Sequence, residues 1–204
     1  EVPFRLPNEW VYGGDWRDTM EHLGNKAILT NNVLLYRLYV LLGSSEKAVA
    51  LKTKINQEFW NGSFYRDWAG GDAFDTLGQA LAVLYDIVPP ERYPAVLQKF
   101  ASVRKYYGYM TNNVSPAPTS KAEAVVIATT NQFSVLWPFI NGFVLLAMVK
   151  MGMREEARRT FLLWTELPGF YEWYGPDTGK GYGEPEQVWS AALYLRCARE
   201  LLRI

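Results

Sequence analysis

Apolar residues recur every three or four positions along most of this chain, which is the spacing of amphipathic helices. Glycine, proline and short polar runs interrupt the pattern and indicate where helices end. Helices are expected at Ala27–Leu42, from the cap at Ser44 through Phe59, around Phe74–Leu84, from Glu91 through Val103, from about Gln132 to Met151, from Arg154 to before Pro168, and at Glu186–Leu202.

The predicted helices form a degenerate repeat. Three times, a long apolar helix ends in a short turn and a more polar helix begins, at Leu42–Ala48, Val88–Tyr93 and Met151–Ala157. No run of residues competes convincingly as a strand. We therefore predict an all-α fold of stacked helical hairpins, with inner helices packed on outer ones.

An aromatic, polar loop precedes each hairpin. If the turns all lie at one end of the stack, these loops gather at the other end and form a cleft there. The acidic residues that such a cleft would collect are Asp15, Asp67, Asp72, Asp75 and Glu172.

Length and composition exclude several classes of function. The chain has 204 residues, enough for one domain over residues 1–204, and its formal net charge of zero gives no sign of a nucleic-acid or acidic-membrane partner. The single cysteine, Cys197, and the single histidine, His22, exclude a disulfide framework and a zinc site built from several such ligands. We expect no metal and no cofactor.

The sequence also bears on location. No apolar run reaches the roughly 18 residues of a membrane span, and no signal peptide is apparent, so we expect a cytoplasmic protein. The chain does not begin with Met, which indicates a processed or truncated piece.

A carboxylate among aromatic residues stands out near the C-terminal end. Glu172 lies between Tyr171 and Trp173, and a Gly/Pro-rich loop then leads to Gln187 and Trp189 at the start of a helix. Aromatic rings give a sugar a flat surface on which to stack. Hydrolysis of a glycosidic bond with inversion needs a second carboxyl group, about 6.5–9.5 Å away, so that a water fits between them.

These residues resemble the six-hairpin (α/α)-barrel glycosidases: trehalases, neutral and alkaline invertases, mannosylglycerate-type hydrolases and glycogen-debranching glucosidases. The stretches that carry the resemblance are Gly13–Asp18 with Gly24–Lys26 and Asn32–Tyr36, Trp137–Phe139 with the helix after it, and Tyr171–Tyr174 through Gln187–Ser190. The first is similar to the region of the general acid, the second to the Trp-Pro helix of invertase-like members, and the third to the segment of the general base.

The resemblance implies an inverting glycoside hydrolase that acts on an α-linked gluco- or manno-type sugar. Glu172 would be the general base and Asp15 the general acid, with Asp18 as the rival acid because an alignment through Trp16 fits nearly as well as one through Gly13. The substrate-binding residues would be Trp16, Arg17, Trp68, Asp75, Trp137, Tyr182, Gln187 and Trp189.

Several residues also have simpler structural interpretations. Asp15 and Asp18 could cap or brace the following segment, Asp72 is expected to be the N-cap of the helix after it, and Arg66 and Asp67 are expected to form an ion pair. Trp137 could belong to the core, although its place near the start of its helix favours a sugar contact. His22 is expected to be polar surface.

The chain departs from the family in size. A six-hairpin barrel has twelve helices and about seven are predicted here, so the chain is either part of a longer enzyme or a reduced version whose ring a second chain completes. An open ring would expose apolar helix faces, and we expect a homo-oligomer or a missing segment. One alternative is a non-catalytic sugar-binding or interaction scaffold. Another is a sugar isomerase or epimerase on a related toroid, but such enzymes typically use His acid/base residues, and the single histidine disfavours this alternative.

Overall fold

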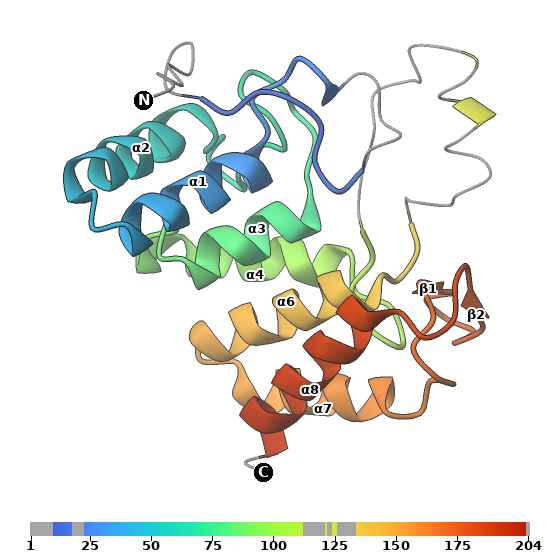
Figure 1. Cartoon of the computed structure of the whole chain (residues 1–204). Helices are drawn as coiled ribbons and strands as arrows, with labels where there is room; N and C mark the ends of the chain where they lie inside the picture. The colour runs from blue at the N-terminus through green and yellow to red at the C-terminus, as the bar shows by residue number, and fades with distance from the viewer. Residues whose placement is uncertain (1–9, 18–22, 112–120, 122–123, 126–133, 203–204) are drawn as a thin grey trace.

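A computed structural model describes residues 10–17, 23–111, 121, 124–125 and 134–202 of the protein (Figure 1). The labelled elements within these residues are α1 (Leu29–Leu41), α2 (Ser45–Glu58), α3 (Thr76–Leu84), η3 (Pro90–Arg92), α4 (Tyr93–Ser102), α6 (Pro138–Lys150), α7 (Arg154–Trp164), β1 (Trp173–Tyr174), β2 (Gly181–Tyr182) and α8 (Val188–Leu202). The prediction of a mainly helical chain is confirmed.

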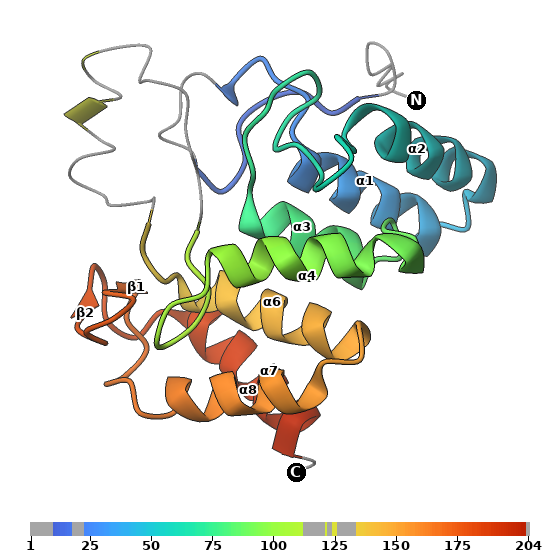
Figure 2. The same cartoon turned by 180° about the vertical axis from the view of Figure 1, so that it is seen from behind.

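The helices form two layers. Helices α1, α3, α6 and α8 pack side by side in that order and make an inner row (Figure 1). Helix α2 packs on α1, α7 packs on both α6 and α8, and α4 lies behind α3 and α6 (Figure 2), so these three form the outer layer. The predicted packing of inner on outer helices is therefore correct, and it has the form of part of an (α/α) toroid.

Short turns occupy one end of this stack and long loops occupy the other. The turns after α1, α3 and α6 lie at the left of Figure 1, whereas the described loops that lead into α1 and α3 lie at the top and the loop with β1 and β2 that leads into α8 lies at the right. Gly43 (φ 71°) and Gly152 (φ 87°) adopt left-handed backbone conformations where α1 and α6 end, which glycine does without steric cost.

Backbone hydrogen bonds connect the long loops to one another. Antiparallel bridges pair Tyr12 with Ala27, Ile28 with Trp68, Arg66 with Phe74 and Leu136 with Tyr174. The Thr111 amide donates to the Val135 carbonyl at 3.0 Å. We call this set of paired segments the loop belt, defined as residues 10–17, 23–28, 65–75, 109–111, 134–137 and 170–174. The hydroxyl of Thr76, which follows the third segment, donates to the Met110 carbonyl at 2.8 Å and joins the first three segments to the last three, so the belt connects the segment of Asp15 to the segment of Glu172.

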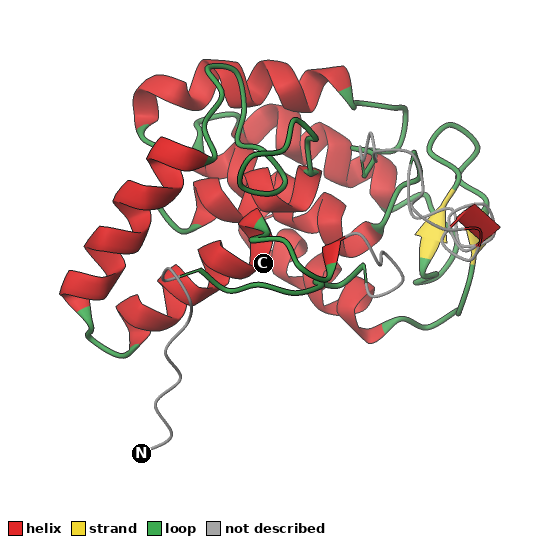
Figure 3. Ribbon diagram, turned by 90° about the horizontal axis from the view of Figure 1, so that it is seen from above, coloured by secondary structure: helices red, strands yellow, loops and turns green. Residues whose placement is uncertain are grey.

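The two short strands differ from the prediction of a chain without strands. Strands β1 and β2 pair antiparallel, with Trp173 opposite Tyr182 and Tyr174 opposite Gly181. Seen from above, they lie at one edge of the helical stack (Figure 3). Strands of two residues each are too short to show the alternation of apolar and polar residues by which a strand is predicted.

One helix begins later than predicted. The helix expected from about Gln132 begins at Pro138, because proline suits the first helical position and Trp137 keeps an extended backbone before it. Residues 132–133 of that prediction lie outside the described residues.

The predicted N-cap at Asp72 is wrong. The Asp75 carboxylate accepts the Gly78 amide at 2.6 Å and caps α3, whereas the Asp72 side chain is fully exposed. The bridge between Arg66 and Phe74 keeps the backbone extended beyond Asp72, so the helix begins three residues later.

The first inner helix leaves an apolar face uncovered. Helix α1 is apolar on nearly every side, and Leu34, Leu38 and Leu41 are 45%, 49% and 66% exposed. This exposure matches the expectation for an open ring, while a homo-oligomer or a missing segment that covers the face stays a prediction, as does the single-domain assignment. In the part of the chain that the structure describes, no helix is both long enough and apolar enough to cross a membrane.

Candidate active site

A buried arginine joins two segments of the loop belt. The Arg17 Nε and Nη2 atoms donate to the two Asp15 carboxylate oxygens at 2.9 and 2.6 Å. Its Nη1 and Nη2 atoms also donate to the two Asp67 oxygens at 2.7 and 2.8 Å. These three side chains are at most 3% exposed. The predicted ion pair between Arg66 and Asp67 is therefore wrong, because Arg17 holds Asp67 in a bidentate pair instead.

A third carboxylate completes what we call the Arg17 cluster: Asp15, Arg17, Asp67 and Asp75. The Asp75 Oδ1 atom lies 4.0 Å from Arg17 Nη1 and has no hydrogen-bond partner among the described residues. Burial raises the pKa of Asp75 to about 7; Arg17 opposes this rise, and the charges of Asp67 and Asp15 add to it. A protonated Asp75 would relieve the excess of three carboxylates over one guanidinium.

Three of the predicted site residues belong to the Arg17 cluster and are buried in it. Both oxygens of Asp15 accept from Arg17 and its side chain is 1% exposed, so a glycosidic oxygen cannot reach it in this conformation. Arg17 and Asp75 likewise direct their polar atoms into the protein, and a contact from either to a sugar stays a prediction. Asp18, the rival acid, and His22 lie outside the described residues.

Glu172 lies at the base of the β1–β2 hairpin, in the last segment of the loop belt. Its amide donates to the Glu184 carbonyl at 2.9 Å, and its Oε2 atom accepts the Glu184 amide at 3.2 Å. Next to it, Trp173 and Tyr182 stack with centroids 4.3 Å apart and an interplanar angle of 8°. Glu172 is half-buried, so the hairpin fixes the carboxylate and still leaves it open to solvent.

A group of four aromatic rings brings distant stretches of the sequence together. Trp16 packs edge-on against Trp137 and Phe139 at 5.2 Å each, and Trp189 stacks on Phe139 at 4.7 Å. Trp137 also contacts Trp189 at 6.1 Å. We call these residues the four-ring cluster. Each of the three stretches that carry the family resemblance contributes at least one ring to it.

The exposure of these rings differs. Trp189 is 39% exposed and Trp137 is 4% exposed. The indole N–H groups of Trp16 and Trp137 are buried and have no hydrogen-bond partner among the described residues. Buried donors without a partner are uncommon in folded proteins. Trp189, the most exposed ring of this cluster, is the one that a ligand can reach.

The remaining predicted binding residues lie elsewhere in the loops. Trp68 packs on Leu23 and Ile28 and not in the four-ring cluster. Tyr182 lies in the hairpin stack, and the Gln187 amide donates to the Phe170 carbonyl at 2.8 Å, which ends the hairpin loop before α8. In the described part of the chain, no three His, Cys, Asp or Glu side chains are grouped to hold a metal ion.

Two residues of this region are absent from the predicted site. Phe139 enters the sequence argument only as part of a motif, although its spacing two residues after Trp137 places both rings at the start of α6. Asp67 is predicted to pair with its neighbour in sequence, and no sequence signal connects it with Arg17, which lies 50 residues earlier.

Comparisons with known proteins support the fold. No protein-family model and no curated protein matches the sequence. Among solved structures, the GH63 mannosylglycerate hydrolase from Thermus thermophilus in complex with Tris is 19% identical with a TM-score of 0.64, and the match covers 86% of this chain and 46% of that one. The complex of this hydrolase with glucose is 21% identical with a TM-score of 0.59, and the match covers 82% and 45%.

A structure described as a sialidase is 17% identical with a TM-score of 0.66, and the match covers 96% of this chain and 22% of that one. At these identities the likeness establishes the fold alone. The chain spans about half the length of the mannosylglycerate hydrolase, at 46%. The chain therefore has the helical-hairpin fold of these structures, in the form of part of an (α/α) toroid.

Proposed function

We propose that this chain supplies the catalytic centre of an inverting glycoside hydrolase. The observation that carries the proposal is the four-ring cluster, in which Trp16, Trp137, Phe139 and Trp189 meet although up to 173 positions separate them in the sequence. Trp189 is 39% exposed, and its ring at the loop end of the helical stack offers a stacking surface for a pyranose, while the buried rings of Trp137 and Phe139 hold it in place.

Glu172 is the proposed general base. It is half-buried in a hairpin that hydrogen bonds hold at both its amide and its carboxylate. A general base must be held in place and must also reach a water molecule, and this environment allows both. The carboxylate would take a proton from the water that attacks the anomeric carbon.

Asp18 is the better candidate for the general acid. The Asp15 carboxylate is buried and accepts three hydrogen bonds from Arg17, which suits a structural role better than proton transfer to a leaving group. Asp18 follows Arg17 directly in the sequence, and it is the other acid that the family resemblance offers. The proposed substrate is an α-linked gluco- or manno-type sugar, which agrees with the mannosylglycerate hydrolase among the structural neighbours.

The test compares single variants on mannosylglycerate and on aryl α-glucosides and α-mannosides. Glu172→Gln should lower kcat by about 10²–10⁴-fold while thermal unfolding stays unchanged, because only the base is lost. Asp18→Asn should have an effect of similar size. Glu184→Gln is the matched control, because Glu184 lies in the same hairpin and is exposed. NMR of the first-formed product should show the inverted anomer. Full turnover by Glu172→Gln would reject its role.

A second candidate is a non-catalytic sugar-binding scaffold. It is favoured by the fact that the Arg17 cluster occupies Asp15 and that the chain spans 46% of the hydrolase. This candidate predicts that the unmodified protein binds sugars and hydrolyses none of the substrates above. It also predicts that Glu172→Gln leaves sugar affinity unchanged.

A further inference from the structure

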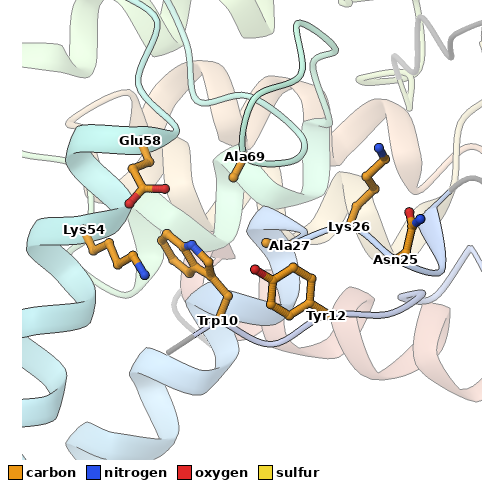
Figure 4. Close-up of a pocket in the computed structure, with 8 residues that line it drawn as sticks. All are labelled: Trp10, Tyr12, Asn25, Lys26, Ala27, Lys54, Glu58 and Ala69. Atoms are coloured by element: carbon orange, nitrogen blue, oxygen red, sulfur yellow. The ribbon is translucent and has the colours of Figure 1, made fainter. Parts of the chain in front are cut away.

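A pocket of about 700 Å³ lies in the loop belt, apart from the four-ring cluster (Figure 4). Its lining residues are Trp10, Tyr12, Asn25, Lys26, Ala27, Lys54, Glu58 and Ala69. Lys54 and Glu58 belong to the outer helix α2, so the pocket lies toward the outside of the stack. None of its residues has a role in the proposed hydrolysis.

Hydrogen bonds fix the walls of this pocket. The Asn32 side chain accepts the Val11 amide at 2.9 Å and donates to the Val11 carbonyl at 3.1 Å. The bridge between Tyr12 and Ala27 closes one wall, and the Ala69 amide donates to the Ala27 carbonyl at 3.0 Å. The concave shape is therefore built into the fold and does not require a ligand to form.

The floor of the pocket is aromatic and anchored. Trp10 is 4% exposed, and its ring packs edge-on against Phe59 at 5.3 Å. The Lys54 ammonium lies over the Trp10 ring, 4.2 Å from its centroid. Tyr12 is 43% exposed and offers a ring face at the mouth of the pocket. Figure 4 shows both rings between the polar side chains of the two opposite walls.

The polar side chains identify the class of ligand. Asn25 can donate and accept, Glu58 accepts, and Lys26 donates. A ligand that matches this mixture carries several hydroxyl groups, because each hydroxyl both donates and accepts. An aromatic face together with mixed hydrogen-bonding groups is the chemistry that holds a neutral sugar ring. The volume lies within the roughly 300–1,000 Å³ of known small-molecule sites.

We propose that this pocket is an accessory binding site for a neutral sugar unit, separate from the proposed catalytic centre. The choice of a sugar over another polyol rests on the proposed function. Tyr12 lies four residues before Trp16 on the same segment of the loop belt, so a sugar held here would be tethered to the segment that contributes Trp16 to the four-ring cluster. The site would thus serve substrates longer than one or two sugar units.

The experiment is a backbone-amide NMR titration of the Glu172→Gln protein with maltotriose and, separately, with methyl α-mannoside. We expect at least one of these sugars to shift the amide signals of Tyr12, Asn25, Lys26 and Ala69. Tyr12→Ala should weaken this binding at least tenfold, and Tyr12→Phe should retain it because the ring remains. Tyr106→Ala is the matched control, since Tyr106 is 55% exposed and lies outside the pocket; it should leave the affinity unchanged.

Glu58→Gln provides a second variant in case Tyr12→Ala fails to fold, and it should weaken binding severalfold through the loss of a charged acceptor. The proposal is overturned if neither sugar shifts the pocket amides at a sugar concentration of about 50 mM, which would detect dissociation constants up to roughly that value. It is also overturned if both variants bind the sugar as tightly as the parent protein does. Turnover without pocket binding would reject this inference alone, and pocket binding without turnover would reject the proposed function alone.

Discussion

The Arg17 cluster and the Glu172 hairpin belong to the same loop belt and place their charges in opposite environments. In the Arg17 cluster, the charged groups are almost fully buried, and Arg17 pairs with Asp15 and Asp67 while Asp75 lies 4.0 Å away. In the hairpin, a half-buried carboxylate rests on a backbone amide next to two stacked rings. The first arrangement fixes loops to one another, and the second presents a carboxylate to solvent.

The contrast shows that an acidic residue in a loop motif is not by itself a reacting residue. Asp15 and Glu172 both stand out in the sequence as acids among aromatic residues. The structure separates them by what occupies their oxygens, since a guanidinium holds both oxygens of Asp15. An acid whose two oxygens a buried arginine occupies can hold two loops together, whereas a half-buried acid beside a flat aromatic surface can still reach a solvent molecule.

The largest expected effect is a loss of stability when the buried Arg17 cluster is disrupted. Arg17→Met should lower the free energy of unfolding by about 3–5 kcal/mol, because it leaves buried carboxylates without a partner. Urea unfolding followed by circular dichroism measures the loss. Arg66→Met is the control, since this side chain is 28% exposed and faces the fully exposed Asp72, and it should unfold close to the parent. Equal losses in the two variants would contradict the role of the cluster.

The second prediction concerns pH. Burial raises the pKa of Asp75 in the folded protein to about 7, above its ordinary value of 3.8. Its contribution to stability is therefore fully present below about pH 4 and is lost as the pH rises to about 7. Relative to Asp75→Asn, which cannot titrate, the parent should lose on the order of 2–4 kcal/mol over this interval. A constant difference between the two unfolding curves from pH 4 to 8 would reject the raised pKa.

The third prediction addresses the hairpin. Gly183 has φ 70°, and a Cβ atom there would overlap the Glu172 carboxylate. Gly183→Ala should cost about 1 kcal/mol and displace Glu172 as well, so kcat should fall at least about tenfold. Gly62→Ala is the matched control, because Gly62 also has a positive φ, 99°, but nothing lies within 4 Å of its Cβ position. It should lose stability and keep activity.

The smallest expected effect is on the ring stack beside Glu172. Tyr182→Leu and Trp173→Leu should each cost about 0.5–1.5 kcal/mol, because both remove the same stacked contact. The double variant should cost less than the sum of the two, which thermal unfolding of all four proteins measures. Additive losses would show that the two rings do not support each other.

The hairpin architecture could be predicted from the sequence because its signals are local. Glycine at the ends of α1 and α6, and proline before η3, end or begin helices through backbone sterics that act within one turn. The spacing of apolar residues then predicts which face of each helix packs against its neighbours. The meeting of Trp16, Trp137 and Trp189 was expected in outline only because the three stretches resemble one family of folds.

The pairings within the loops could not be predicted. Arg17 has acidic neighbours on both sides in the sequence, and its choice of Asp67 depends on how two loops approach in three dimensions. The position of the α3 cap depends in the same way on the bridge between Arg66 and Phe74. The pocket at Tyr12 has no local signal either, because its walls come from four separate segments.

The loop belt has a consequence for the dynamics of the molecule. Loops usually exchange their amide hydrogens quickly, since solvent reaches them without unfolding. Here the amides of Leu29, Thr111, Leu136 and Tyr174 donate to carbonyls of neighbouring loops. Each of these hydrogens can exchange only when two adjacent hairpins separate at the loop end. The slowest-exchanging loop amides should therefore mark the boundaries between hairpins, and they would report the order in which the hairpins come apart.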